Sequence, residues 1–329
     1  MSAVQGTVQA VVDAGGEPAA RLMERLELRL AELATGHGAL LARHAGETIA
    51  AGGKRLRPLL LFLSAGSPPP ETDDVLRAAV AVELVHSATL VHDDVLDGSP
   101  LRRGRPTVVA VGGRLPATAT GDLLFSRAFA ELARSRSVAS VRVLSRASSE
   151  LARGELMQRA DSFVAVGVDR YLERCRLKTA VLFRAACELG AIEGGRDGAH
   201  AQRVAALASF GERIGLAFQL LDDVLDVTGP PERTGKPRGA DLLDGTVNLP
   251  LIIARRRDDE LASLDPRSIT DPAVAEDVCA RISATGALET ARQLALDRVA
   301  GAKAALPDLP APQRAALELI ADAVVERYS

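Results

Sequence analysis

Aromatic residues are scarce in this sequence of 329 residues: they make up 3% of it, and tryptophan is absent. Alternating stretches of the kind that form half-buried strands are short, whereas Ala, Leu, Arg and Glu recur at helical spacing. Breaks rich in Gly or Pro separate segments of roughly two to six helical turns. The scarcity of strand signals argues against a β-rich fold and predicts an all-α protein.

Cysteine and long apolar runs are also scarce. The three cysteines, Cys175, Cys187 and Cys279, form no Cys-x-x-Cys pair and are odd in number, which argues against a disulfide framework and a zinc site. No run of about 18 apolar residues is present, and the N-terminus lacks a basic segment followed by an apolar one. We therefore expect a cytoplasmic protein that contacts a membrane at most peripherally.

Charge of one sign does not accumulate anywhere in the sequence. The formal net charge is -3, and no block of like charges stands out, which argues against a broad basic surface for nucleic acid. Any anionic ligand has to be bound by a local cluster of cations. Hydrophobic residues at 47% and charged residues at 25% are typical of a globular protein, and no linker divides the chain, so we expect one domain.

One pentapeptide, Asp-Asp-Val-Leu-Asp, occurs twice, at Asp93 to Asp97 and at Asp222 to Asp226. Each copy ends an apolar helical stretch and precedes a break that contains Gly and Pro, which places the acids on the last turns of a helix. The first and last acids of each copy are four residues apart and share a face. Acids at a helix C-terminus repel one another and meet the negative end of the macrodipole, so this arrangement favours bound cations.

Two such helix ends facing each other would form a carboxylate cage for a hard divalent ion. Magnesium takes a few carboxylates and fills its other positions with water and phosphate oxygens, which suits a diphosphate ester. A lone pair of acids is more often a solvated helix face, but the repetition and the apolar flanks favour a metal site. The spacing also lacks the Gly and Glu of an EF-hand calcium loop. The predicted ligands are Asp93, Asp94, Asp97, Asp222, Asp223 and Asp226.

Basic residues that suit two diphosphates lie near these acids in the sequence. The stretch Gly52-Gly53-Lys54-Arg55-Leu56-Arg57-Pro58 places three cations before an apolar helix, where backbone amides add to phosphate affinity. Other candidates are Arg102, Arg103, Lys178 and Lys236. Each alone is more often a surface charge, but together they supply the point charges of Lys and the planar forks of Arg.

Two histidines on the first acidic helix have different interpretations. His86 is seven residues before Asp93 on the same face and could donate to a phosphate, although a lone helical His is otherwise a partly buried core residue. For His92, next to the acids, the structural interpretation is preferred.

At these residues the sequence resembles the trans-isoprenyl diphosphate synthases, from about Gly52 to the C-terminus. The shared motifs, in the family's order, are Gly-Gly-Lys-Arg-Leu-Arg-Pro, both Asp-Asp-x-x-Asp motifs, Arg102 to Thr107, Gly121-Asp122, Lys178-Thr179-Ala180, Phe218-Gln219 and Gly235-Lys236-Pro237. The resemblance implies a single-domain antiparallel helical bundle of the isoprenoid synthase type around a deep central cavity. It also implies a homodimer. We expect residues 1–45 to form an N-terminal helical segment and residues 46–329 the catalytic core.

The resemblance also implies roles for individual residues. The six acids and Lys178 look catalytic, with the acids binding three Mg²⁺ per active site. The residues that look like contacts to the allylic diphosphate are Arg102, Lys178, Gln219 and Lys236, and Thr179 looks like a further substrate contact. Those that look like contacts to isopentenyl diphosphate are Lys54, Arg57, His86 and Arg103. One departure is Thr246, which stands where the family often has a phosphate-binding lysine.

The implied reaction is a Mg²⁺-dependent head-to-tail (1'-4) condensation of isopentenyl diphosphate with an allylic diphosphate. A class I terpene cyclase would share the fold but would not need Lys54, Arg57 and Arg103. A noncatalytic subunit of a heteromeric synthase should have lost acids that are intact here. A short-chain synthase making farnesyl or geranylgeranyl diphosphate stays a further alternative.

Product length is predicted from residues one and two turns before Asp93, namely Val85, Ala88 and Thr89. None is aromatic, which resembles medium- and long-chain members such as heptaprenyl or octaprenyl diphosphate synthases. Burial of each added five-carbon unit contributes up to about 4 kcal/mol at ~0.8 per carbon, which favours elongation. We expect products beyond C20, in the C30 to C45 range, with release aided by a membrane.

Overall fold

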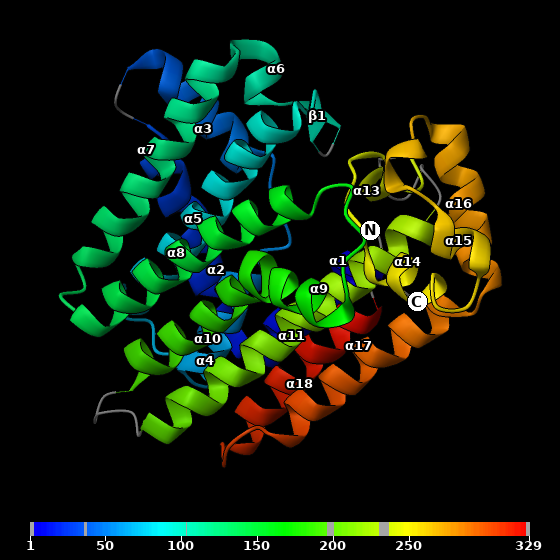
Figure 1. Cartoon of the computed structure of the whole chain (residues 1–329). Helices are drawn as coiled ribbons and strands as arrows, with labels where there is room; N and C mark the ends of the chain where they lie inside the picture. Colours follow the sequence, from blue (N-terminus) through cyan, green and yellow to red (C-terminus); the bar gives the residue numbers. More distant parts are fainter. Residues whose placement is uncertain (1–2, 36–37, 103, 196–200, 230–236, 327–329) are drawn as a thin grey trace. The chain divides into compact units, whose positions relative to one another are not determined.

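The structure is a computed structural model that describes residues 3–35, 38–102, 104–195, 201–229 and 237–326 (Figure 1). Helices dominate these residues, and one two-stranded antiparallel hairpin joins β1 to β2, so the prediction of an all-α protein is confirmed. The helices are α1 (Ala3–Ala14), α2 (Gly16–Ala34), α3 (Ala39–Ala50), α4 (Leu56–Ala65), α5 (Asp73–Asp97), α6 (Val108–Gly112), α7 (Arg114–Ala133), α8 (Val138–Asp161), α9 (Val168–Cys175), α10 (Val181–Gly194), α11 (Ala201–Thr228), α13 (Ala240–Leu243), α14 (Leu249–Ala254), α15 (Asp259–Ser263), α16 (Pro272–Ala284), α17 (Ala287–Ala304) and α18 (Ala311–Glu326). The shorter elements are β1 (Leu101–Arg102), β2 (Arg105–Pro106), the π-helical turn η1 (Arg176–Ala180) and the 3₁₀ turn η2 (Pro266–Ser268).

The chain forms two compact units, each drawn from several stretches of sequence. The first unit comprises residues 1–148, 182–211 and 305–323, and the second comprises residues 149–181, 212–304 and 324–329. Each unit contains one copy of the repeated pentapeptide. The expected division into residues 1–45 and 46–329 stays a prediction.

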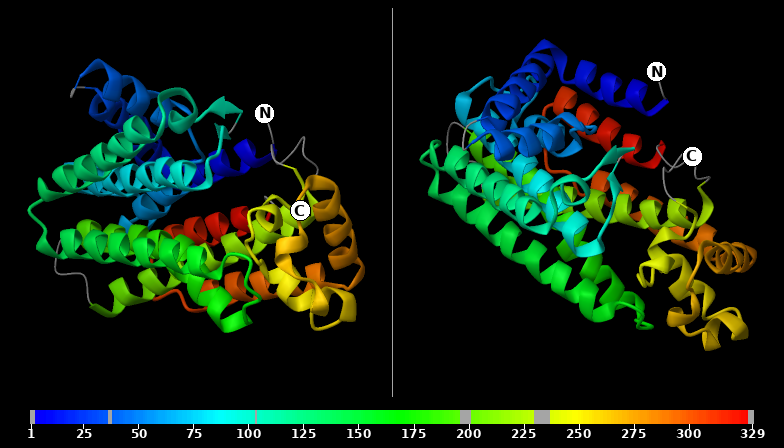
Figure 2. Two further views of the ribbon diagram at one scale, coloured as in Figure 1. Left: turned by 45° about the horizontal axis from the view of Figure 1, so that its top comes forward. Right: turned by 90° about the horizontal axis from the view of Figure 1, so that it is seen from above.

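Helix α5 is the central helix of the first unit. Thr72 caps its start by accepting a hydrogen bond from Val75 N, and Gly98 ends it in the left-handed conformation, with φ 62°. Nearly all faces between these ends are buried, as in a helix covered on every side by other helices. It packs on α2, α4 and α7, and both views of Figure 2 show α5 and α7 running side by side.

Close approach of α5 and α7 depends on Gly121 of α7. A Cβ atom built there would lie 2.2 Å from His92 Nε2, closer than any real contact. His92 stacks on Phe125, with ring centroids 5.8 Å apart, and its Nε2 lies 3.3 Å from Asp122 Oδ1. These contacts agree with the structural interpretation of His92 and give a reason for the glycine in the Gly121-Asp122 motif.

The second unit is organised around the end of α11 and the short helix α14. Asn248 caps α14 by accepting a hydrogen bond from Leu251 N, and every residue of α14 is buried. Helix α14 packs on α9, α16 and α17. The segment before it thereby runs past the second acidic motif.

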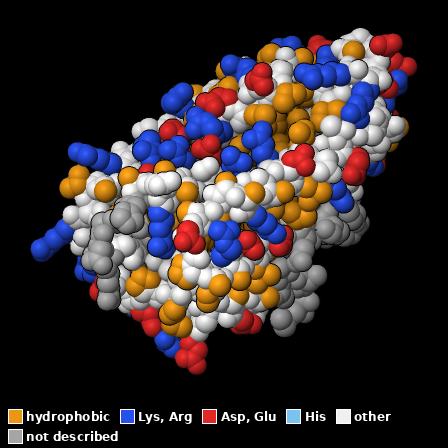
Figure 3. Space-filling model, turned by 90° about the horizontal axis from the view of Figure 1, so that it is seen from below, with side chains coloured by type: hydrophobic (Ala, Val, Ile, Leu, Met, Phe, Trp, Pro, Cys, Tyr) orange, Lys and Arg blue, Asp and Glu red, His pale blue; other side chains and the backbone are white. Residues whose placement is uncertain are grey.

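Two described helices, α5 and α11, are long and apolar enough to cross a membrane by length and composition. In α5, 72% of the apolar window is buried inside the protein, as in the core helix of a globular fold. On the face drawn in Figure 3, Lys and Arg side chains alternate with Asp and Glu, and patches of apolar side chains lie between them. That face therefore carries no broad surface of one charge.

Candidate active site

The first acidic motif occupies the last turns of α5, where the sequence predicted it. Asp94, its middle acid, is 5% exposed, and its Oδ1 accepts hydrogen bonds from Nε and Nη2 of Arg102, each at 2.8 Å. Asp93 is half-buried and Asp97 is exposed. Arg102, predicted to contact the allylic diphosphate, therefore also holds the middle acid of this motif.

The second acidic motif occupies the end of α11 and has a different support. Asp223 is 3% exposed and accepts hydrogen bonds from Tyr171 Oη at 2.7 Å, Gln219 Nε2 at 2.9 Å and Leu249 N at 3.3 Å. Burial raises the pKa of Asp223, although the three hydrogen bonds act in the opposite direction. Asp222 and Asp226 are half-buried, and Asp226 Oδ1 accepts from Asp241 N at 3.3 Å.

The two motifs share one pattern: the middle acid is buried and bonded to protein donors, and the outer acids, four residues apart, are more accessible. The outer acids Asp93, Asp97, Asp222 and Asp226 are hard oxygen donors of the kind that Mg²⁺ binds through a few carboxylates. Among the described residues, no group of three or more His, Cys, Asp and Glu side chains is arranged to hold a metal ion. The carboxylate oxygens of the outer acids fit magnesium, whereas Asp94 and Asp223 are already bonded to protein donors. That all six acids are metal ligands stays a prediction.

The Gly52–Arg57 stretch connects α3 to the first turn of α4. Lys54 and Arg57 are half-buried, and the Arg57 guanidinium lies over the Phe183 ring, 4.5 Å from its centroid. Arg55 departs from the expectation that three cations face a ligand, because it is 7% exposed and ion-paired with Glu27 and Glu83. No sequence pattern indicated this pairing, because Glu27 and Glu83 come from other helices and are each 28 residues away from Arg55 along the chain.

A cavity of about 310 Å³ lies in the first unit between α3, α5, α6 and the β1–β2 hairpin. Its lining includes Gly52, Arg55, Glu83 and the predicted isopentenyl contact His86. Asp94 and Arg102 line it as well, and Leu90, Val91, Val108 and Val111 add apolar surface. Such a mixture of apolar walls and charged groups of both signs suits a small ligand with a polar end.

Lys178 and Thr179 lie in the π-helical turn η1, a distortion often found at functional sites. Lys178 Nζ donates to Glu155 Oε2 at 2.7 Å, and Thr179 Oγ1 donates to Gln219 Oε1 at 2.7 Å. Gly154 of α8 lets η1 pack closely, since a Cβ there would lie 2.7 Å from Lys178 N. Thr179, Gln219 and Asp223 thus form one chain of hydrogen bonds, which sequence reasoning did not find.

The segment that carries Thr246 has its own fixed geometry. Thr246 N donates to Asp241 O at 2.8 Å, and Arg174 Nη2 donates to Val247 O at 2.7 Å. Arg174 is buried and its Nη1 lies 3.6 Å from Asp161 Oδ2. Backbone contacts hold the segment where the family often has a lysine.

The remaining predicted residues are placed as follows. Val85 and Ala88 are fully buried in α5, and Thr89 is half-buried and donates its hydroxyl to His86 O at 2.8 Å. None of these three is among the described residues that line the cavity. Arg103 and Lys236 lie outside the described residues.

Several known proteins are similar to this chain over most of its length. The polyprenyl synthetase family matches residues 39–280. A relative named heptaprenyl diphosphate synthase component 2, from Geobacillus stearothermophilus, is 40% identical over 243 residues, which is 73% of this chain and 74% of that protein. Geranylgeranyl diphosphate synthase of Methanosarcina mazei is 37% identical over 284 residues, 84% of this chain and 86% of that one.

A solved structure is also similar over almost the whole chain. Polyprenyl synthase from Caulobacter crescentus, in complex with calcium and isoprenyl diphosphate, has a TM-score of 0.88 and 37% identity, with 98% of each chain covered. That protein therefore accommodates a divalent cation and a diphosphate on a similar all-helical fold.

Proposed function

From the premise that the chain belongs to the polyprenyl synthetase family and is a prenyltransferase, we propose that it elongates an allylic diphosphate with isopentenyl diphosphate to all-trans products beyond C20. The observation that carries the proposal is the shared pattern of the two acidic motifs. Each ends a helix with outer acids that are more exposed than its middle acid, and each holds that middle acid on protein donors.

The reaction begins with loss of diphosphate from the allylic substrate to give a carbocation. The outer acids would hold Mg²⁺, which when bound would neutralise the leaving group's negative charge, and three such ions per active site are part of this proposal. Arg102, Lys178 and Lys236 add positive charge at the same diphosphate, and Gln219 and Thr179 orient it.

The second substrate supplies the electrons for the new carbon–carbon bond. Lys54, Arg57, His86 and Arg103 hold the diphosphate of isopentenyl diphosphate, so that its double bond attacks the allylic carbon. Loss of a proton then forms the new allylic double bond, and the released diphosphate accepts that proton. Apolar walls exclude water, which would otherwise trap the cation as an alcohol.

One incubation tests the function against its rivals. The purified chain alone receives Mg²⁺, farnesyl diphosphate and labelled isopentenyl diphosphate, and labelled products are separated by length. We expect elongation beyond C20. A cyclised hydrocarbon would indicate a terpene cyclase, and absence of product would indicate a chain that needs a second component.

The name of one relative gives a reason to test whether this chain needs a second component. The Geobacillus relative is named as component 2 of its synthase, whereas we propose a homodimer for this chain. Measuring both the molecular mass and the activity of the purified chain distinguishes a homodimer from a heteromeric synthase. An active homodimer supports our proposal, and an inactive chain with intact acids supports the heteromeric one.

Product length is the finer part of the proposal, because relatives include both heptaprenyl and geranylgeranyl diphosphate synthases. Small residues at Val85, Ala88 and Thr89 support a long product. Ala88→Phe is expected to shorten the product while the first condensation persists. Ala79→Phe is the matched control. Ala79 is also fully buried, but it lies on the opposite face of α5 from Ala88.

Two outcomes would contradict the product-length assignment. One is a wild-type enzyme that stops at C15 or C20 with excess isopentenyl diphosphate. The other is an Ala88→Phe variant with an unchanged product, which would place the length-determining residues elsewhere. We further propose a cytoplasmic enzyme whose product leaves through peripheral membrane contact, which liposomes added to the assay would test by faster release.

A further inference from the structure

Arg55 occupies an unusual position between two proposed ligand contacts. It follows Lys54, precedes Arg57 by two residues, and caps the start of α4 with a positive φ of 47°. A residue with a Cβ atom rarely adopts this left-handed conformation unless its surroundings enforce it.

The side chain of Arg55 connects three helices of the first unit. Its Nε donates to Glu27 Oε1 of α2 at 2.6 Å, and its Nη1 donates to Glu83 Oε1 of α5 at 2.7 Å. Its Nη2 donates to Glu27 Oε2 and to Ile49 O of α3, both at 3.1 Å. One planar guanidinium thus fixes the loop between α3 and α4 against α2, α3 and α5.

Burial makes this arrangement selective for arginine. Glu83 has 5% side-chain exposure and Arg55 has 6%, whereas Glu27 is half exposed. A lysine would keep the positive charge but could not donate in the same plane to both carboxylates, so Glu83 would lose a well-placed donor inside the protein. The loop would then be free to relax from its left-handed conformation.

Arg55 and Glu83 also form part of the wall of the 310 Å³ cavity. Gly52, Arg55 and Glu83 line that cavity together with His86, which is one turn from Glu83 on α5. A shift of the Gly52–Arg57 loop would therefore move Lys54 and Arg57 and change the cavity that His86 faces.

We propose that Arg55 is a positioning residue for isopentenyl diphosphate: its fork on Glu27 and Glu83 sets the loop that presents Lys54 and Arg57 to the diphosphate. This inference rests on the proposed function, which assigns Lys54, Arg57 and His86 to that substrate. Arg55 itself does not contact the substrate, because its donors are directed to the two carboxylates and the Ile49 carbonyl.

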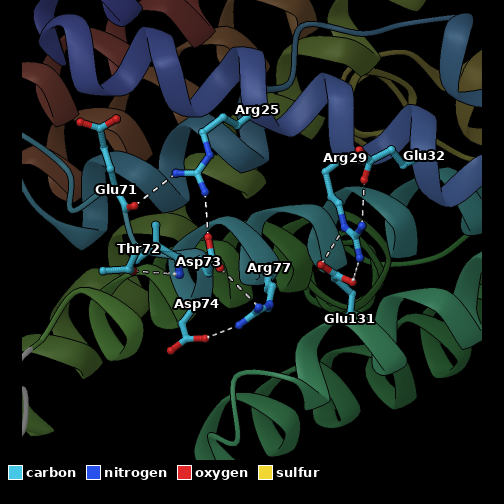
Figure 4. Close-up of polar contacts among 10 residues, drawn as sticks. Arg25, Arg29, Glu32, Glu71, Thr72, Asp73, Asp74, Arg77 and Glu131 are labelled. Carbon is cyan, nitrogen blue, oxygen red and sulfur yellow. Dashed lines mark hydrogen bonds and ion pairs between the residues drawn. The ribbon is translucent and has the colours of Figure 1, made fainter.

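The matched control is a second arginine fork, formed by Arg29 of α2, the helix that also carries Glu27. Arg29 Nε and Nη2 donate to Glu131 of α7 at 3.0 and 2.7 Å, and Glu131 is as buried as Glu83, with 5% side-chain exposure (Figure 4). This pair joins two helices of the first unit but no predicted substrate contact. Arg29→Lys therefore makes the same chemical change without touching the loop.

The experiment compares Arg55→Lys and Arg29→Lys with wild type by thermal unfolding, calorimetric binding of isopentenyl diphosphate and steady-state kinetics. Both variants are expected to unfold at lower temperature. Only Arg55→Lys is expected to raise the KM and Kd for isopentenyl diphosphate, by about tenfold or more, with the KM for the allylic diphosphate within about twofold of wild type. Equal substrate constants in folded Arg55→Lys and wild type would overturn the proposal.

Glu27→Gln covers the case in which Arg55→Lys does not fold. Because Glu27 is half exposed, its amide should keep the fold while it weakens the fork, and a smaller rise in the isopentenyl constants is expected. An unchanged KM and Kd in this variant would also overturn the positioning role. Failure of the proposed function is distinguishable, since wild type itself would then neither bind isopentenyl diphosphate nor form product.

Discussion

The same five residues, Asp-Asp-Val-Leu-Asp, end a helix in each unit of the molecule, yet the two copies are supported differently. In the first, the middle acid Asp94 is held by the charged fork of Arg102. In the second, the middle acid Asp223 is held by three uncharged donors, from Tyr171, Gln219 and the Leu249 backbone. An ion pair and a hydrogen-bond network thus perform the same task for identical peptides.

The difference follows from what surrounds each helix end. Arg102 lies in the hairpin directly after α5, and its side chain is 32% exposed, so this cation is partly solvated. Tyr171 is 1% exposed and comes from α9, which packs against α14. The first support is local and accessible, whereas the second adds to the neighbouring Gln219 two buried donors, Tyr171 and Leu249 N, that are distant in sequence.

The largest expected effect tests what the two copies have in common. Asp93→Ala or Asp222→Ala should reduce turnover by several orders of magnitude, because the charge of the leaving diphosphate would not be neutralised. If both motifs serve the same diphosphate, the double variant should lose little more than the worse single variant. Turnover at saturating Mg²⁺ measures this, and thermal unfolding controls for folding.

Near-normal turnover of Asp93→Ala would contradict the metal assignment of the first copy. Fully multiplicative losses in the double variant would instead indicate that the two motifs act independently.

A second comparison sets a proposed contact of the first unit against one of the second. Arg57→Ala should raise the KM for isopentenyl diphosphate by about ten- to a hundredfold, since a charge-assisted contact is lost. Lys178→Ala should raise the KM for the allylic diphosphate by a similar factor. Initial rates with each substrate varied in turn measure both constants, and equal changes in both within one variant would refute the partition.

The two supports themselves can be compared by stability. Tyr171→Phe removes a buried donor from Asp223 and should lower the free energy of unfolding by about 1–3 kcal/mol. Arg102→Lys keeps a charge at a partly solvated site and should cost about 1 kcal/mol or less. Chemical denaturation measures both, and a larger loss in Arg102→Lys would reverse the proposed order of the supports.

The smallest expected effect is on the free energy of unfolding at alkaline pH, and it involves Cys175, which interacts with Asp223 of the second copy. Burial, and next the charge of Asp223, raise the pKa of the Cys175 thiol from 9.0 to about 12. The stability that this neutral thiol contributes is fully present below pH 9 and is lost as pH rises through about 12. Cys175→Ala should therefore flatten the decline of unfolding free energy over this range by up to about 1.4 kcal/mol per pH unit.

Cys187 of the first unit is the control for that prediction. Burial raises its pKa to about 12 as well, with a hydrogen bond from Ser64 acting in the opposite direction. Cys187→Ala should flatten the pH dependence to a similar extent. If the pH dependence of the unfolding free energy changed in Cys175→Ala but not in Cys187→Ala, the effect would be due to the Asp223 carboxylate rather than to burial.

Local patterns predicted the all-α fold and the placement of both acidic motifs at helix ends. Apolar periodicity and the Gly and Pro breaks were sufficient for this, because helix formation and capping depend on neighbours in sequence. Gly98 ends α5 in the left-handed conformation, where the sequence indicated a stop.

The pairing of charges could not be predicted in the same way. Arg55 was grouped with Lys54 and Arg57 as a cation near a ligand, yet its fork binds Glu27 and Glu83, each 28 residues away along the chain. Tyr171, 52 residues from Asp223, carried no recognisable signal either.

The amino-acid sequence by itself determined the helices, the two sets of three carboxylates and the chemistry that they offer to a cation, because side-chain type and helical period are local properties. Only the tertiary structure decided which acid of each set is buried and which cation turns inward. Burial and ion pairing depend on which helices pack together, and in Asp94 and Asp223 that packing gives one peptide two different supports.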